Sequence, residues 1–481
     1  MRALRGIRGR CQLAATLLLL VGALQAQVQI GQRAPAATWR RPACAGSVEL
    51  SGPGAAGVTL IGFYVSRPDL LAGDLGYLEA VADRFAGLGA RVLLVTTEGG
   101  EQGARGAERC VAFIDEGGLT EQEWLGHADV LRDRLVAVDQ DGVVQFVGAP
   151  GCGVEDMLER HLRGEVDRCY EEHARVWRRK LVAGYDDLAS QSTIDLLAPL
   201  VARSPTDGLL AGLLYLTYAT KANDLDAARA LLDRAITAMA DAPRALAVFA
   251  DLALRGDPLR AEVWRALRAP LEAAAGSACS DPLVQLALLR ALVADRDGRA
   301  VGHLAMTCHK HVAATAEGSL DFAMLLARAE TPMIHRDLAE YAVARAGELG
   351  GDVRLIAAAQ YVVALRCAED RRAADEVLAR YLSEQDALYG HNNDAWYFLT
   401  ELATAGRFDW FAVGLVECLL TDPGAMDYFE LDTAALAMFL VERADDAVGL
   451  QEAALEQGGR HEAAYRDRLA RYKAYRDLTL R

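Results

Sequence analysis

The chain contains no two cysteines separated by two residues, the spacing that redox dithiols and most zinc sites require. Its nine cysteines are scattered over 481 residues, which is too sparse for a small disulfide-stapled scaffold. The G-x-S-x-G and H-E-x-x-H patterns of common hydrolases and metalloproteases are also missing. The sequence therefore predicts no catalytic residue, no metal site and no cofactor.

Basic residues are fewer than acidic residues in this chain. Lysine and arginine number 51 against 67 acidic residues, which gives a formal net charge of −16. Such an excess of acid repels phosphate backbones and anionic lipid. We therefore expect neither nucleic acid nor a membrane surface as a partner.

Long apolar runs are confined to one place, the uncharged stretch from Leu13 to Leu24. It follows four arginines and precedes small residues around Ala26, the order of a secretory signal; the arginines are Arg2, Arg5, Arg8 and Arg10. The run is about half of the ~20 residues that span a bilayer, so an uncleaved anchor is the weaker alternative. We expect residues 1–26 to be a cleaved signal peptide, no membrane span after cleavage, and an exported protein, periplasmic or extracellular.

Residues 27–165 have the pattern of an α/β domain with a mixed sheet. Apolar runs predict strands at Val58–Val65, Arg91–Thr97, Leu135–Asp139 and Val143–Gly148. Helices are predicted at Leu70–Leu88, Ala104–Glu116 and Val154–Arg163. Asp141-Gly142 supplies the hairpin turn between the last two strands.

Three stretches of this domain resemble the redoxins, exported thiol-disulfide oxidoreductases with a thioredoxin-like fold. "IGQRAPAATWR" is similar to the entry segment of that family, and "LVAVDQDGVVQFVG" is similar to its closing hairpin. "FYVSRPDLLAGDLGYLE" keeps the frame of the segment that carries the redox motif. The resemblance covers roughly residues 28–163 and implies a thioredoxin-like domain.

The same resemblance implies that the redox chemistry is lost. Pro68 and Leu71 stand where the family has its two cysteines, and Asp133 stands where it has a substrate-binding cis-proline. A dithiol motif works because its first thiol lies at a helix N-terminus, which lowers the thiol pKa. Proline and leucine supply no nucleophile, so we expect a degenerate site.

Two other cysteines, Cys110 and Cys152, are the candidate thiols if any activity remains. Cys110 falls within the predicted helix Ala104–Glu116, and Cys152 follows the last strand in "GAPGCG". Neither precedes the first helix, so a core thiol and a loop thiol are the simpler interpretations. A thiol-disulfide oxidoreductase that uses displaced cysteines stays the alternative.

From residue 166 onward the apolar residues recur at helical spacing. Residues 166–204 are predicted to be a linker with leading helices, and residues 205–481 to be helical repeats that end in a capping helix. "DAWYFLTELATAGRFDWFAVGLVECLLTDP" resembles one tetratricopeptide unit. Small residues recur 39, 35, 38 and 35 positions apart, at Ala300, Ala339, Ala374, Ala412 and Ala447. A non-repetitive helical bundle is the alternative.

Cys279 and Cys308 are a candidate disulfide, because one precedes the first helix of a predicted pair and the other ends its second helix. Free buried thiols are an equal alternative. The "CHKH" stretch that begins at Cys308 offers two metal ligands without an identifiable third, which disfavours a zinc site.

The sequence thus predicts an α/β thioredoxin-like domain followed by an all-α, tetratricopeptide-like array. The functional hypothesis is an exported, non-catalytic interaction or scaffold protein that binds a protein or peptide ligand on its helical-repeat surface.

Overall fold

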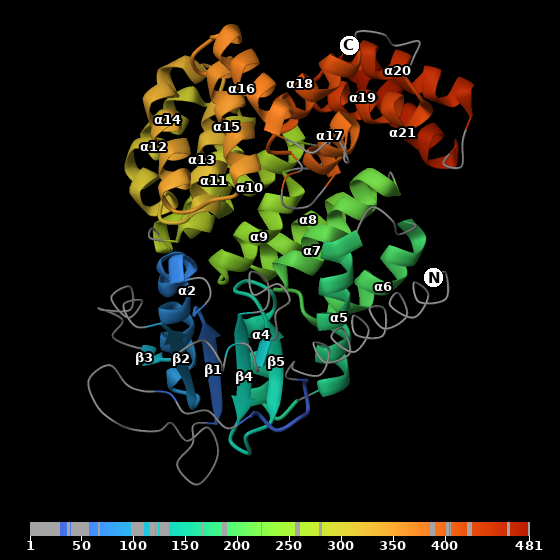
Figure 1. The fold of residues 1–481 in the computed structure, drawn as a ribbon. Coiled ribbons are helices and arrows are strands. Elements are labelled where there is room, and N and C mark those ends of the chain that lie inside the picture. The colour runs from blue at the N-terminus through green and yellow to red at the C-terminus, as the bar shows by residue number, and fades with distance from the viewer. Residues whose placement is uncertain are drawn as a thin grey trace, which may run out of the picture. The chain divides into compact units, whose positions relative to one another are not determined.

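A computed structural model gives the fold of the chain (Figure 1). It describes residues 29–35, 39, 57–65, 68–97, 110–115, 121, 124–125, 134–165, 167–184, 190–222, 224–254, 260–278, 281–384, 390–400, 404, 406–420, 426–458 and 462–479. The predicted signal peptide, residues 1–26, lies outside these ranges. None of the helices described is both long and apolar enough to cross a membrane.

The chain forms a small mixed sheet near its N-terminus, followed by a region that is helical throughout its described part. It divides into two compact units. The first comprises Met1–Leu252 with Pro270–Val284, and the second comprises Ala253–Ala269 with Gln285–Arg481.

The sheet has five strands in the order β3-β2-β1-β4-β5. They are β1 (Val58–Phe63), β2 (Ala90–Thr96), β3 (Cys110–Ile114), β4 (Leu135–Asp139) and β5 (Val144–Gly148). β1, β2 and β3 run parallel, whereas β4 is antiparallel to both β1 and β5. β1 is apolar except for Thr59 and is wholly buried, as expected for a strand at the centre of a sheet.

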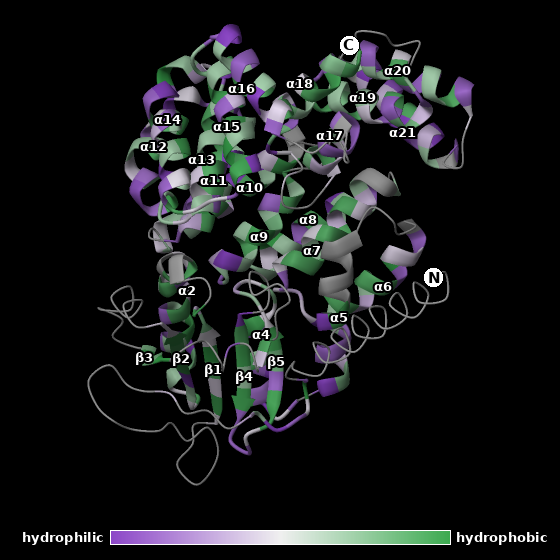
Figure 2. Cartoon of the chain, in the orientation of Figure 1, coloured by the Kyte–Doolittle hydropathy of each residue, from purple (hydrophilic) through white to green (hydrophobic). Residues whose placement is uncertain are grey.

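Both faces of the sheet are covered. On one face, Val58 and Leu60 of β1 pack with the buried sides of α2 (Pro68–Ala86) and α4 (Val154–Leu162). On the other face, Ile61 and Phe63 pack against the rings of Trp39 and Trp124. Figure 2 shows the apolar character of the strands against the mixed surfaces of the helices.

The predicted helix Ala104–Glu116 is wrong where it can be checked, because residues 110–114 form strand β3. β3 pairs in parallel with β2 from Cys110 to Ile114. The stretch "CVAFI" is short, apolar and partly β-branched, a composition that suits a strand or a buried helix equally. Pairing with β2 decides between the two.

The first unit continues from the sheet into helices. These are α5 (Arg168–Gly184), α6 (Ser190–Arg203), α7 (Gly208–Leu216), the π-helix η3 (Thr217–Lys221), α8 (Leu225–Ala238) and α9 (Pro243–Ala253). Helix α10 (Arg260–Ser277) and the start of α11 (Pro282–Ala294) also contribute to it. Helices beyond the predicted boundary at residue 165 therefore group with the sheet.

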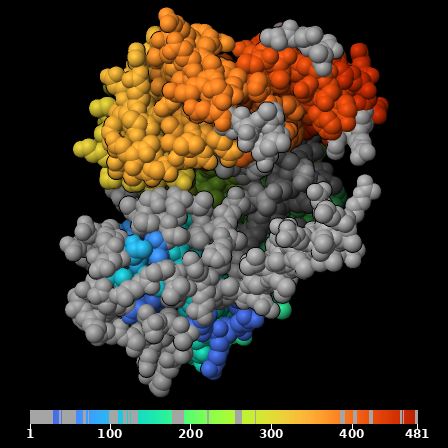
Figure 3. Space-filling model, in the orientation of Figure 1, coloured from blue at the N-terminus to red at the C-terminus, as the bar shows by residue number. Residues whose placement is uncertain are grey.

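The second unit is a succession of helix pairs. The first part of α10 and most of α11 belong to it. Its further elements are α12 (Gly298–Val312), α13 (Ala316–Arg328), the 3-10 helix η4 (Pro332–His335), α14 (Arg336–Glu348), α15 (Val353–Arg366), α16 (Arg371–Glu384), α17 (Gly390–Thr400), α18 (Asp409–Leu419), α19 (Tyr428–Leu440), α20 (Ala444–Gln457) and α21 (Glu462–Thr479). α13 packs on α14, α15 on α16, α17 on α18 and α19 on α20. Side chains of the described residues between about 300 and 384 form a continuous surface, yellow to orange in Figure 3.

The recurring alanines occupy the second helix of each pair. Ala339, Ala374, Ala412 and Ala447 lie on α14, α16, α18 and α20, and each is fully buried. A small buried side chain at such positions lets neighbouring helices approach closely. Aspartate caps start several of these helices, including Asp297 before α12 and Asp352 before α15.

Candidate functional site

Pro68 and Leu71, the predicted positions of the lost redox cysteines, lie at the start of α2. The helix begins at Pro68, and Leu71 is fully buried in the core beneath it. Asp133, at the predicted cis-proline position, lies outside the described residues. Its neighbour Arg134 immediately precedes β4 and is described.

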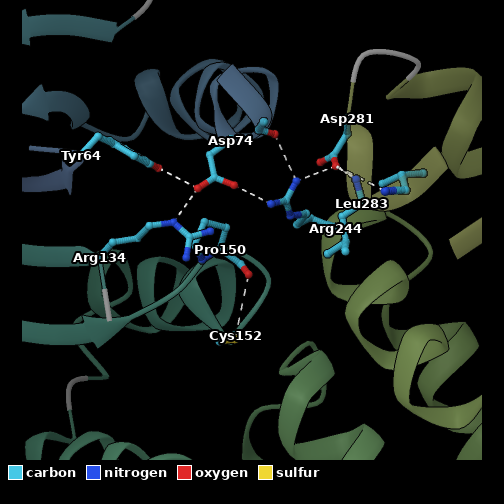
Figure 4. Close-up of polar contacts among 10 residues, drawn as sticks. Tyr64, Asp74, Arg134, Pro150, Cys152, Arg244, Asp281 and Leu283 are labelled. Carbon is cyan, nitrogen blue, oxygen red and sulfur yellow. Dashed lines mark hydrogen bonds and ion pairs between the residues drawn. The ribbon is translucent and has the colours of Figure 1, made fainter. Parts of the chain in front are cut away.

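A buried carboxylate, Asp74, lies one turn after Leu71 on the same helix (Figure 4). The hydroxyl of Tyr64 donates a hydrogen bond to Asp74 Oδ2 at 3.0 Å. Nε of Arg134 donates to the same oxygen at 2.6 Å. Residues from the end of β1, from α2 and from the start of β4 therefore meet at one carboxylate.

Arg244 of α9 completes this cluster from a distant part of the sequence. Its Nη2 atom donates to Asp74 Oδ1 at 2.5 Å, and its Nη1 atom donates to the carbonyl oxygen of Gly73 at 3.3 Å. Nη1 also donates to Asp281 Oδ1 at 2.5 Å. All of these residues belong to the first unit. Arg244 thus joins α9 to the N-terminal part of α2 and to the start of α11.

Asp281 has a second role as the N-terminal cap of α11. Its Oδ1 atom accepts hydrogen bonds from the backbone nitrogens of Leu283 and Val284. A cap of this kind satisfies backbone donors that have no partner within the helix. We call the five residues Tyr64, Asp74, Arg134, Arg244 and Asp281 the Asp74 cluster.

The charges in the Asp74 cluster compensate one another. Burial alone would raise the pKa of Asp74, but the positive charges of Arg134 and Arg244 outweigh it, so the pKa lies below its ordinary value. Burial and the negative charge of Asp74 raise the pKa of Tyr64 well above its usual range. Asp74 is therefore ionised and Tyr64 protonated near neutral pH, as the hydrogen bonds require.

The Asp74 cluster contains no thiol, and the oxygens of Asp74 accept three hydrogen bonds from side chains of the chain itself. A carboxylate used as a general base needs a position open to substrate. Asp74 is only 2% exposed. The arrangement suits a structural junction rather than a reaction.

A second buried acid lies near this junction. Glu155, in the first turn of α4, is 5% exposed, and burial raises its pKa from 4.5 to about 7. The Tyr77 hydroxyl of α2 is among the groups that interact electrostatically with it. The folded state therefore favours the protonated, neutral form of Glu155.

The loop between β5 and α4 provides the surface on which the helices dock. The nitrogen of Gly208, at the start of α7, donates to the carbonyl oxygen of Gly151 at 3.2 Å. A Cβ atom placed on Gly151 would lie 3.1 Å from the carbonyl oxygen of Arg244. Asp156 of α4 accepts hydrogen bonds from the Ser204 hydroxyl and from the nitrogen of Thr206. Backbones approach closely here because glycine occupies the contact points.

Neither candidate thiol of this domain lies at the start of α2. Cys110 is on strand β3, and burial, with the negative charges of Glu79 and Asp83, raises its pKa to about 12. Cys152 is 6% exposed in the β5–α4 loop, where it forms a β-bridge with Asp207. Its Sγ atom lies 3.9 Å from the carbonyl oxygen of Pro150 (Figure 4). A protonated, buried thiol such as Cys110 is a poor nucleophile.

Cys308 is the described member of the candidate disulfide. Cys308 is buried on α12, and burial raises its pKa to about 12. Cys308 has a free thiol in the structure. Cys279 lies outside the described residues, and a disulfide between the two stays a prediction. Within the described ranges, no three His, Cys, Asp or Glu side chains come together in a way that could hold a metal ion.

Sequence reasoning overlooked the Asp74 cluster, although one of its members carried a signal. Asp74 lies three residues after Leu71 and four before Leu78, both buried, so it occupies the apolar stripe of α2. Nothing local distinguishes Arg244, because its partner lies 170 residues away.

Comparisons with known proteins give no independent assignment. No protein-family model matches the chain, and no curated protein matches it significantly.

Proposed function

We propose that this protein is an exported, non-catalytic scaffold that binds other proteins, and that it combines a redox-inactive thioredoxin-like domain with tetratricopeptide-like helical repeats. The observation that carries the proposal is the contact of Arg244 with Asp74. An element of the chain itself, α9, engages the N-terminal part of α2, the region with which thioredoxin-like enzymes carry out their chemistry.

The sheet supports the thioredoxin-like part of the proposal. Its strands β2, β1, β4 and β5 lie in that order, with β1 and β2 parallel and the other two pairs antiparallel. Helix α2 follows β1 directly, as the redox helix does in that fold. Pro68 and Leu71 provide no thiol at its start.

The helix pairs support the second part. The fully buried alanines at Ala339, Ala374, Ala412 and Ala447 recur at 35, 38 and 35 residues, near the ~34-residue tetratricopeptide period. Stacked helix pairs offer long surfaces for peptides and helices. Export is proposed from the sequence of residues 1–26.

A dithiol-dependent disulfide reductase assay on the purified protein tests the non-catalytic assignment. We expect no turnover, and no change in the Cys110→Ser and Cys152→Ser variants. As a positive control, the Pro68→Cys/Leu71→Cys double variant restores a dithiol at the start of α2 and is expected to gain activity. Native activity that disappears in Cys110→Ser or Cys152→Ser would instead establish a thiol-disulfide oxidoreductase with displaced cysteines.

A further inference from the structure

Glu155 carries a buried carboxyl in the segment that holds α7 on the α/β part of the first unit, which comprises β1–β5, α2 and α4. Its Oε2 atom has no hydrogen-bond partner among the described residues, and the residue is 5% exposed. Four residues earlier, the carbonyl oxygen of Gly151 accepts a hydrogen bond from the nitrogen of Gly208, which begins α7. One residue later, Asp156 accepts a hydrogen bond at 2.8 Å from the hydroxyl of Ser204, in the turn before α7.

Helix α9 packs on the same segment. A Cβ atom on Gly151 would lie 3.1 Å from the carbonyl oxygen of Arg244 and 3.1 Å from a methyl carbon of Val248. Arg244 also reaches α2, where it is ion-paired with Asp74. The contacts of α7 and α9 with the α/β part therefore meet within a few residues of Glu155.

An ionised Glu155 would have little charge compensation. The charged groups of neighbouring elements that act on its carboxyl, or on the adjoining Tyr77 hydroxyl of α2, are Arg84 of α2, Asp156 of α4 and Arg244 of α9. Arg84 is already paired with Glu159 at 2.6 Å, and Asp156 carries the same sign of charge as Glu155. Arg244 is engaged by the two aspartates of the Asp74 cluster. Burying a charge without compensation is unfavourable.

We infer that Glu155 is a pH-sensitive switch for the docking of α7 and α9 on the α/β part. The contact is closed while the carboxyl holds its proton. Once the carboxyl has released the proton to solvent, its negative charge lies beside Asp156 in a desolvated site, and local opening of α7 and α9 brings water to it. The opening also uncovers the N-terminal part of α2, which Arg244 contacts in the closed form. The switch involves the first unit alone and does not depend on the scaffold proposal.

The sign and the size of the effect follow from the pKa of Glu155. Burial raises this pKa from 4.5 to about 7, and exposure to solvent in the open form restores the ordinary value. A rise in pH through this range therefore favours the open form. With these two pKa values, the equilibrium constant for opening increases about tenfold between pH 6 and pH 8.

Hydrogen exchange of backbone amides, measured on the full-length protein by mass spectrometry, tests this inference. After correction for the pH dependence of the intrinsic exchange rate, the protection of α7 and α9 should fall about tenfold from pH 6 to pH 8. Amides of β1 should exchange more slowly than those of α7 and α9 at both pH values, because they require unfolding of the whole unit. Helix amides as slow as those of β1 would overturn the inference, since α7 and α9 would then open only when the unit unfolds.

The Glu155→Gln variant keeps the size of the side chain but cannot ionise. Its protection in α7 and α9 should be the same at pH 6 and pH 8. Asp226→Asn is the matched control, because Asp226 is exposed on the neighbouring helix α8, and it should keep the tenfold fall of the native protein. A fall of the same size in Glu155→Gln, or no fall in the native protein, would overturn the switch.

Titration of the native protein keeps the inference testable even if the Glu155→Gln variant folds poorly. In carbon NMR spectra of the full-length protein labelled at its glutamate carboxyl carbons, one signal should titrate with a midpoint of about 7. If every glutamate signal titrated near its ordinary midpoint of about 4.5, the switch would be overturned. Neither measurement bears on the scaffold proposal, which the reductase assay tests separately.

Discussion

At the scale of single residues, Asp74 holds two buried arginines in place. Replacing Asp74 with asparagine leaves Arg134 and Arg244 without their shared negative charge in a desolvated site. Breaking a buried ion pair from one side costs about 3–5 kcal/mol of stability. We expect Asp74→Asn to lower the melting temperature of the first unit by on the order of 10 °C, measured by circular dichroism or calorimetry.

The Asp226→Asn variant controls for the loss of one acidic charge. Asp226 faces Arg229 at 3.5 Å, but its side chain is 98% exposed. An exposed pair of this kind contributes little to stability. If Asp226→Asn and Asp74→Asn lowered the melting temperature equally, the Asp74 cluster would have no structural role.

Glu155 gives the first unit a pH dependence of a definite sign. Because burial raises its pKa to about 7, folding penalises the ionised form. This penalty is absent below pH ~4.5, where the carboxyl is protonated in both states, and is complete above pH ~7. Stability should therefore fall across this window, by about 3 kcal/mol at most from this residue.

The Glu155→Gln variant removes the charge without emptying the site. We expect it to match the native protein near pH 4.5 and to be more stable at pH 8, as judged by urea unfolding at both pH values. Glu159→Gln is the control on the same helix, because Glu159 is ion-paired with Arg84 at 2.6 Å and should show no gain at high pH. A stability difference for Glu155→Gln that did not change with pH would contradict the assignment.

The residues of the candidate site could be predicted from the sequence only in part. The resemblance of residues 63–79 to the redoxin motif segment predicted that Pro68 and Leu71 replace the thiols. Asp74 could also have been noticed, because it is an acid on the apolar stripe of α2. Arg244 could not, since its role depends on the docking of α9, which no local pattern encodes. Long-range ion pairs depend on tertiary packing rather than on periodicity.

At the scale of elements, the contact between α7 and α9 depends on a glycine. A Cβ atom on Gly208 would collide with the carbonyl oxygen of Ala245, and it would lie 3.1 Å from the nitrogen of Phe249. Because both obstacles are backbone atoms, α7 or α9 would have to shift. We expect Gly208→Ala to destabilise the first unit by about 1–3 kcal/mol, measured by chemical unfolding.

Gly276→Ala provides the comparison. Gly276 lies on α10, also in the first unit, and no heavy atom lies within 4 Å of the Cβ that alanine would add. Alanine has a higher helix propensity than glycine, so this variant should be equal to or slightly more stable than the native protein. Destabilisation by both substitutions would show that close packing at Gly208 is not the cause.

Elements with a clear pattern were predicted within a few residues. Strand β4 was predicted at its observed bounds, and β1, β2, β5, α2 and α4 differ by only a few residues at their ends. β3 was missed because five apolar residues carry no decisive period, and its pairing with β2 is non-local. Four of the five spaced alanines, Ala339, Ala374, Ala412 and Ala447, are fully buried on second helices, whereas the first of the series, Ala300 on α12, is only partly buried. The classification of those pairs remains a proposal.

At the scale of the whole molecule, the first unit depends on parts of the chain beyond the sheet. The boundary predicted at residue 165 separates Asp74 and Arg134 from Arg244 and Asp281, although the structure joins them in one cluster. The contacts of Gly151 and Asp156 with α7, α9 and the turn before α7 cross the same boundary. A fragment that ends at residue 165 therefore lacks Arg244, one of the two arginines that pair with Asp74.

A comparison of two fragments tests this dependence. Residues 27–284 retain all members of the Asp74 cluster, whereas residues 27–165 lose Arg244 and Asp281 and expose the surface covered by α7 and α9. We expect the longer fragment to unfold cooperatively and the shorter one to be several kcal/mol less stable in urea. Arg244→Ala in the longer fragment should give an intermediate stability, because it removes the ion pairs but keeps most helix packing. Equal stability of the two fragments would mean that the sheet and its two helices form an independent domain, and that the contacts of α9 add nothing to its stability.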